Sequence, residues 1–563
     1  MTARPKVLVI GLDGATFDLL NPLFARGLMP FLQSLMGSSY SGTLLSTVPP
    51  ISATAWATFV TGVNPGSHGI LQFVRLRPSE NGSAPSASRE IFPGGVSFLD
   101  ASSIRGVRLW DILSAAHKRQ IVINVPLTYP PRPIDGVMIT GMMTPPSASV
   151  FTYPPDLSSR LLEGKYEIDL TVSEKDFSFD PSRLIYRLHE LLVKRRDVAL
   201  KLLQEPWDFS MAVFTGTDRL QHRFWKYLVP GFAEYDSVEA AHLRPALEQY
   251  FEGLDQALAR LVNCAGANTT TVLLSDHGFG PVSERTIHRL SLMRALGLGK
   301  AAAKSGVGRL RTVVEGYLGL TPDQMRKLAA KALPRQWVSR LEARARDTLI
   351  TASASDPAYS VTLHEFIGGI YIDRGQLADD HSAEVFRQEI MSGLEKLVDP
   401  DTGTPLVAKA YSREELYSGP ALEECPDIIF YVTPGYGLSG GYGPGGSIVS
   451  PRRSDLNKQG THRDDGMLLI RGPNVNPKQE VRERLVDVTS TILYLLDVPI
   501  PSAMDSRPIL RAFRKEAVAK RPPEYADVAL ESTASGAGGA QPQVSEEDAE
   551  ELLARLRGLG YIE

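Results

Sequence analysis

Short apolar runs alternate with longer amphipathic segments along the first half of the chain. The apolar runs, many of them rich in β-branched residues, predict buried strands at Val7–Leu12, Ile121–Pro126, Gly136–Gly141, Met211–Asp218 and Thr271–Gly278. Apolar positions at helical spacing predict long helices over Ser182–Gln204 and Ala240–Val262. Strands that alternate with helices predict an α/β fold with a doubly wound, mostly parallel central sheet and helices on both faces.

The later pattern predicts additions to this main domain. Apolar runs near residues 367–373, 407–411 and 427–432 indicate a smaller α/β subdomain. A segment rich in Ser, Gly and Ala indicates a linker before a last amphipathic helix, which we expect to dock on the body of the same protein. We therefore expect a main domain over 1–299 and 355–514, a helical insertion over 300–354, a subdomain over 376–450, a linker over 515–543 and a C-terminal helix over 544–563.

The insertion is strongly basic. Lysine and arginine outnumber the few acidic residues between 300 and 346, and Thr321-Pro322-Asp323 is typical of a helix start. Three interpretations stay open for this segment: a solvated helical face, a cap over an anionic substrate, or a contact with a membrane surface.

Composition narrows the classes of function. With 60 Lys and Arg against 64 Asp and Glu, the 563-residue chain has a formal charge of -4, which gives no nucleic-acid-binding signature. Cys264 and Cys425 are the only cysteines, which excludes a disulfide framework and fits a reducing compartment. The apolar runs are too short for a signal peptide or a transmembrane helix, so we expect a cytoplasmic protein. Its oligomeric state is not predicted.

Acidic residues and histidines gather at the ends of the predicted strands. They are Asp13, Asp218, His222, Asp276, His277 and His462. Asp218 and His222 are four residues apart, so a helical turn would place both side chains on one face. Carboxylate and imidazole groups without thiolates favour zinc, with manganese or iron as alternatives. The six residues divide into three and three, which predicts a site for two divalent ions.

Ser52 follows Pro49 and Pro50 and precedes a run of small residues. Because proline favours an extended chain, we expect Ser52 to be the N-cap of a helix whose first N–H groups can also bind an anion. Coordination to a divalent ion is one way to activate such a hydroxyl as a nucleophile. Ser52 is thus a candidate both for a cap and for an additional metal ligand.

Five motifs occur in the order GLDG, PPIS…TGVNPGSHGI, TDRLQH, SDHGFG and GTHRDDG. In this order they resemble the alkaline phosphatase superfamily, in the prokaryotic branch of the type I phosphodiesterase/nucleotide pyrophosphatase family. The resemblance extends from Lys6 to about Leu510. It implies an alkaline-phosphatase-like fold and two zinc-like ions, one held by Asp13, Ser52, Asp276 and His277 and the other by Asp218, His222 and His462.

The resemblance also implies a function. Ser52 occupies the position of a nucleophile that attacks phosphorus and forms a covalent phosphoenzyme, which water then hydrolyses. We therefore expect a metal-dependent hydrolase of small phosphate esters, acting on diesters or pyrophosphates rather than monoesters. The alternatives are a phosphomonoesterase, a phosphotransferase similar to phosphoglycerate mutase, and a metal-retaining binding protein without catalysis.

One position departs from the family pattern. Nucleotide pyrophosphatases carry an asparagine five residues after the histidine of the SHG motif, and this chain has Phe73 there. Gln72 is the neighbouring amide, but strand alternation would point it the other way. Nucleotide specificity is therefore not predicted. His68 of the SHG motif is expected to be structural or to support a site residue from behind.

Overall fold

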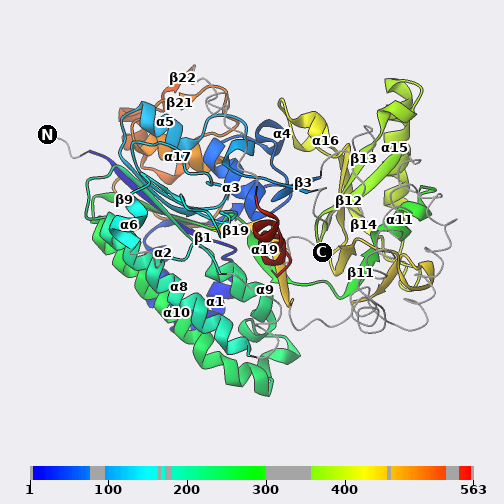
Figure 1. The fold of residues 1–563 in the computed structure, drawn as a ribbon, viewed down its shortest axis with the longest axis horizontal. Coiled ribbons are helices and arrows are strands. Elements are labelled where there is room, and N and C mark those ends of the chain that lie inside the picture. The colour runs from blue at the N-terminus through cyan, green and yellow to red at the C-terminus, as the bar shows by residue number, and fades with distance from the viewer. Residues whose placement is uncertain are drawn as a thin grey trace.

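The computed structural model describes residues 4–76, 96–162, 166–170, 180–298, 357–452, 458–527 and 544–558. Figure 1 shows a large sheet flanked by helices and, beside it, a smaller sheet with its own helices. The predicted basic insertion over 300–354 lies outside the described residues. Among the described residues, none of the helices combines the length and the apolar character needed to cross a membrane.

The main sheet has nine strands in the order β20-β2-β19-β9-β1-β8-β5-β6-β7. Its parallel centre consists of β9 (Thr269–Leu274), β1 (Lys6–Leu12), β8 (Phe209–Phe214), β5 (Gln120–Val125) and β6 (Gly136–Thr140). These are the five strands that the apolar runs predict.

Antiparallel pairing appears toward both edges of the main sheet. Strand β19 (Asp465–Arg471) runs antiparallel to β9 and to β2 (Tyr40–Leu45), and β7 (Thr152–Tyr153) runs antiparallel to β6. Strand β20 (Lys478–Arg484) completes the sheet parallel to β2. The predicted doubly wound, mostly parallel sheet is therefore confirmed.

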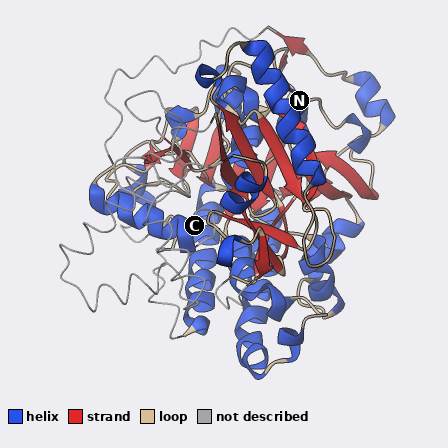
Figure 2. Ribbon diagram, turned by 90° about the vertical axis from the view of Figure 1, so that its right-hand side faces the viewer, coloured by secondary structure: helices blue, strands red, loops and turns tan. Residues whose placement is uncertain are grey.

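Two hydrophobic cores cover the two faces of this sheet. Figure 2 shows the helices that flank it. Side chains of β1 alternate between them: Val7 and Val9 belong to one core, and Leu8 and Ile10 to the other. The first core contains residues of α3 (Ser52–Thr61), α5 (Leu109–Ala115) and α17 (Val486–Leu495). The second contains residues of α1 (Phe17–Ala25), α2 (Pro30–Gly37), α8 (Pro181–Leu202), α9 (Gly216–Leu228) and α10 (Val238–Ala265).

The small subdomain is built on an antiparallel sheet in the order β12-β13-β15-β14. Its strands are β12 (Ala358–His364), β13 (Ile367–Ile372), β14 (Val407–Ser412) and β15 (Ile428–Val432). Residues of α11 (Arg289–Ala295) and α15 (Asp380–Lys396) share a hydrophobic cluster with this sheet. In Figure 1 the subdomain lies to the right of the main sheet.

Short strands lie between the main sheet and the small subdomain in the chain order. Strand β10 (Gly278–Pro281) pairs with β18 (Gly460–Arg463), and β11 (Arg285–His288) lies between β16 (Tyr436–Ser439) and β17 (Val449–Pro451). Other short elements include α4 (Pro65–His68), α6 (Leu157–Leu162), α16 (Arg413–Leu416), β3 (Val74–Leu76) and β4 (Val96–Phe98).

The end of the chain is more structured than the predicted linker. Residues 515–527 form α18 (Lys515–Lys520) and β22 (Tyr525–Ala526), which pairs with β21 (Ile500–Pro501). The partly buried Val518 packs against the first core, and the hydroxyl of Tyr494 donates to the carbonyl oxygen of Arg521 at 3.0 Å. The last described element is α19 (Glu546–Gly558), whose Leu552 and Leu556 are buried in the same core.

Candidate active site

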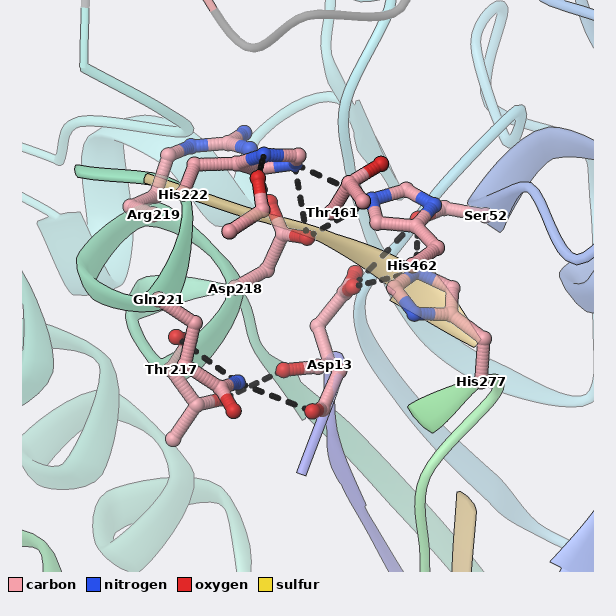
Figure 3. Close-up of polar contacts among 12 residues, drawn as sticks. Asp13, Ser52, Thr217, Asp218, Arg219, Gln221, His222, His277, Thr461 and His462 are labelled. Atoms are coloured by element: carbon pink, nitrogen blue, oxygen red, sulfur yellow. Dashed lines mark hydrogen bonds and ion pairs between the residues drawn. The ribbon is translucent and has the colours of Figure 1, made fainter. Parts of the chain in front are cut away.

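The parallel strands deliver acidic residues to one edge of the main sheet (Figure 3). Asp13 follows β1, Asp276 follows β9, and Asp218 lies in the first turn of α9, just after β8. Because neighbouring parallel strands end at the same edge, these carboxylates converge. The antiparallel β18 adds His462 from a distant part of the chain. All four side chains are buried.

Ser52 is the first residue of α3 and is fully buried. Its Oγ lies 3.3 Å from Oδ1 of Asp13 and 3.1 Å from Nε2 of His277. The predicted N-cap role is wrong, because Ile51 holds the N-cap position and no side-chain cap bond forms there. The hydroxyl points into the acidic cluster instead, beside the N-terminal end of the helix.

Asp218, His222 and His462 form the first candidate metal-binding group. Oδ1 of Asp218 lies 3.4 Å from Nε2 of His222 and 3.2 Å from Nε2 of His462, and the two Nε2 atoms are 3.0 Å apart. The four-residue spacing of Asp218 and His222 thus places both side chains on one side of α9, as predicted.

The second candidate group consists of Asp13, Asp218 and His277. Nε2 of His277 lies 3.4 Å from Oδ1 of Asp13 and 3.5 Å from Oδ2 of Asp276. Asp276 is held in place by the backbone N–H of Gly14, which donates to its Oδ1 at 3.2 Å. Asp218 belongs to both groups and therefore lies between them, which the sequence did not indicate.

The histidine hydrogen bonds indicate that this site is built for cations. Each Nδ1 atom lies against a backbone carbonyl oxygen: His222 against Gly460 at 3.1 Å, His462 against Pro50 at 2.9 Å and His277 against Gly278 at 3.0 Å. A carbonyl oxygen only accepts, so each Nδ1 carries a proton and Nε2 is the ring nitrogen that faces the site. These Nε2 atoms and the carboxylate oxygens lie 3.0–3.5 Å from one another, an arrangement that divalent ions stabilise. The residues present fit the metal ions that the motifs imply.

The neighbouring charges shift the pKa values of the three aspartates in different directions. Burial, and then the neighbouring Asp276 and Asp218, hold the pKa of Asp13 well above its usual range. Burial also raises the pKa of Asp276 to about 7. Burial acts in the same direction on Asp218, but His222 and His462 outweigh it and hold the pKa of Asp218 well below its usual value. Burial followed by the charge of His277 lowers the pKa of His462.

Sequence reasoning missed two buried residues beside this cluster. Nη1 of Arg219 donates to Oδ2 of Asp218 at 3.1 Å, and its Nη2 donates to Oδ2 of Asp169 at 2.6 Å. The Arg219 and Asp169 side chains are 3% and 1% exposed. For Arg219, the one signal in the sequence was its position next to the candidate ligand Asp218. Asp169 had none, because it lies outside every motif.

Phe73, which stands where the family pattern has an asparagine, has a structural role. Phe73 is 1% exposed and belongs to the first core, so its side chain is part of the packing. Nε2 of Gln72 donates to the carbonyl oxygen of Thr362 in the small subdomain at 2.9 Å. His68 is fully buried, bonds Oγ1 of Thr58 at 2.9 Å, and has its pKa lowered to about 3 by burial.

Two solved structures are similar to this one, and the first of them shows the shared fold. Phosphonoacetate hydrolase from Sinorhizobium meliloti 1021, solved with phosphonoformate, matches with a TM-score of 0.52 at 16% identity, over 88% of this chain and 96% of that chain. Murine ectonucleotide pyrophosphatase/phosphodiesterase 5 has a TM-score of 0.48 at 12% identity, over 90% of this chain and 100% of that chain. A search of curated proteins found no match.

The sheet, its flanking helices and the motif order define a member of the alkaline phosphatase superfamily. The family model described as type I phosphodiesterase / nucleotide pyrophosphatase matches residues 7–467. The chain belongs to that family. Phosphoester hydrolysis with metal ions is the chemistry of the family, and the Asp and His groups described above are candidate sites for such ions.

Proposed function

We propose that this protein hydrolyses phosphodiester or pyrophosphate bonds of small molecules, with Ser52 as the nucleophile. The observation that supports this proposal is the position of the Ser52 hydroxyl, which lies 3.1 Å from His277 and 3.3 Å from Asp13 at the start of α3. A serine that only capped a helix would bond to backbone N–H groups, but this hydroxyl faces residues with metal-ligand chemistry.

Two divalent ions fit this arrangement, with zinc first and manganese or iron as alternatives. Asp13, Ser52, Asp276 and His277 would hold one ion, and Asp218, His222 and His462 the other. When bound, the ions would supply Lewis acidity that lowers the pKa of the Ser52 hydroxyl and of a water molecule.

Two displacements at phosphorus then follow, in which the protein's own groups take part. Oγ of Ser52 forms a bond to phosphorus while the bond from phosphorus to the leaving oxygen breaks on the opposite side, and the proton of the hydroxyl passes through solvent to the leaving group. The backbone N–H groups of Ala53 and Thr54 precede the first hydrogen bond of the helix, which Ala55 donates to Ile51, so they can donate to phosphoryl oxygens. A water oxygen then attacks the same phosphorus, the bond from phosphorus to Oγ breaks, and a proton of that water passes to Oγ and restores the Ser52 hydroxyl.

The test compares bis-p-nitrophenyl phosphate with p-nitrophenyl phosphate for zinc- and manganese-loaded protein. We expect diester turnover in the wild type and its loss in Ser52→Ala with metal content unchanged. Ser38→Ala, at an exposed position, is the matched control. A clear preference for the monoester would replace the proposal with a phosphatase. Unchanged diester turnover in Ser52→Ala would refute the nucleophile.

A further inference from the structure

The C-terminal helix α19 docks on the loop that follows β6. The backbone N–H of Ser147 donates to Oδ1 of Asp548 at 3.0 Å, and the Ser147 hydroxyl donates to Oδ2 of the same carboxylate. Asp548 also accepts from the hydroxyl of Ser545 at 2.8 Å, so one carboxylate joins the helix start to the loop. Figure 1 shows α19, in red, beside the part of the main domain that faces the small subdomain.

The same loop contacts Arg219. Met142 and Met143 belong to the hydrophobic core that also contains Leu552 and Leu556 of α19. Sδ of Met142 lies 3.7 Å from Nη2 of Arg219. The helix and the candidate metal ligand Asp218 are therefore connected through one packed loop and one arginine.

A second connection is electrostatic. Arg555 of α19 is 4% exposed, although a surface helix normally keeps its arginines in water. Burial raises the pKa of Asp169, but Arg219 and then Arg555 outweigh it, and the pKa is lowered. Arg555 pairs with Glu551 of the same helix at 3.7 Å, and its charge also favours the ionised form of the Asp169 carboxylate, which accepts from Arg219 at 2.6 Å.

We propose that α19 is a positioning element of the active site, which acts through Asp169 and the loop after β6 to hold Arg219 against Asp218. Arg555 is its positioning residue. The helix adds no group to the reacting atoms. It fixes the orientation of the Asp218 carboxylate, and residues that orient a metal ligand typically affect affinity or activity by about 10–100-fold.

The inference rests on the proposed function only for its kinetic readout. The first readout is the absorption spectrum of the Co²⁺-substituted protein, which reports the ligand geometry at Asp218, His222 and His462 whether or not any ester is turned over. The second is the split between kcat and KM for bis-p-nitrophenyl phosphate. A wild type that binds Co²⁺ but hydrolyses neither ester would refute the proposed function, while the spectra would still decide the role of α19.

Three variants of the full chain are compared: Arg555→Met, Arg555→Lys and Glu550→Gln, the last being the matched control at an exposed position of the same helix. We expect Arg555→Met to change the Co²⁺ spectrum and to lower kcat by about 10-fold with KM within about 3-fold. Arg555→Lys should recover part of both losses, because it keeps the charge. Unchanged spectrum and kcat in Arg555→Met would overturn the proposal.

Deletion of 544–563 tests the whole helix. We expect the same spectral change and a larger loss of kcat, with recovery when a synthetic peptide of residues 544–563 is added. A deletion variant that is more active than the wild type would make α19 an inhibitory segment and overturn the proposal. If the deletion variant fails to fold, the Arg555 variants decide the question alone.

Discussion

Asp13 and Asp218 follow neighbouring parallel strands of one sheet, yet their surroundings act on them in opposite directions. Asp13 lies with Asp276 and Asp218, and the pKa of Asp13 is raised. Asp218 lies with two histidines and Arg219, and its pKa is lowered. Both carboxylates are buried, so burial does not explain the difference. The sign of the neighbouring charges decides whether a buried carboxylate is ionised.

This contrast divides the site into two functional halves. In the Asp218 half, His222 and His462 hold the pKa of Asp218 low, and Arg219, which is paired with Asp169, donates to that carboxylate. In the Asp13 half, burial and the neighbouring carboxylates raise the pKa values of Asp13 and Asp276. We therefore expect the first half to be prepared for an ion by the protein, and the second half to lose protons when an ion binds.

The largest expected effect is that of Asp218→Asn, because Asp218 belongs to both candidate metal groups. Loss of its charge should weaken binding of the ion at His222 and His462 by more than about 100-fold, since loss of a ligand exceeds the effect of its supporting residues. Zinc content after dialysis measures this. Asp255→Asn is the matched control, because Asp255 is also buried but bonds the start of α2. Equal zinc retention in both variants would contradict the prediction.

The two halves should load with metal at different pH. The pKa of Asp276 is raised to about 7, so that half must release protons to bind a cation, and its affinity should increase as pH rises through 7. The pKa of Asp218 is lowered, so its half should load already at about pH 5.5. Titration of Co²⁺ at about pH 5.5 and 8 should show one equivalent and then two. Two equivalents at both pH values would remove the distinction between the halves.

The contribution of Asp276 to the stability of the metal-free protein should fall as pH rises. Folding raises the pKa of Asp276 from 3.8 to about 7, so the folded state keeps a proton that the unfolded chain has released in that window. The unfolded state then binds fewer protons, and the free energy of unfolding decreases with pH. Buried His68 and His462, whose pKa values are lowered, make stability rise with pH in wild type and variant alike. The difference in Tm between chelator-treated wild type and Asp276→Asn, followed between about pH 5 and 7.5, therefore isolates the effect. A difference that does not change with pH would show that Asp276 is ionised in the fold.

Two asparagine variants should change that metal-free stability in opposite directions. Asp276→Asn removes a like charge near Asp13 and Asp218 and should raise Tm at about pH 7.5. Asp218→Asn leaves Arg219 and two histidines without their carboxylate and should cost about 3–5 kcal/mol. Urea unfolding of both variants at one pH provides the measurement. Changes of the same sign would mean that the pKa contrast between the halves is not real.

The smallest expected effect is that of Gln72→Ala. Gln72 bonds Thr362 of the small subdomain, so its loss should cost about 1 kcal/mol of stability and leave diester turnover within about 2-fold. Kinetics with bis-p-nitrophenyl phosphate beside a Tm measurement separate the two effects. A loss of turnover above 10-fold would instead place Gln72 on the substrate.

Much of this architecture could be predicted because its signals are local. Apolar runs such as Val7–Leu12 predict buried parallel strands, and parallel strands place the residues that follow them at one edge. The spacing of Asp218 and His222 fixes a shared face within one helical turn. The candidate ligands could therefore be named from strand ends and motif order.

The remaining features depend on contacts between distant segments, which no local pattern encodes. The contact of His222 with His462 joins residues 240 positions apart, and that of Ser147 with Asp548 spans 401. Arg219 and Asp169 are a further such pair, because Asp169 lies in a loop that contains no recognisable motif. Only the folded chain decides such pairs, because they form through packing of separate elements. The sequence by itself determined which residues reach the edge of the sheet, and the tertiary structure decided which charges surround each of them.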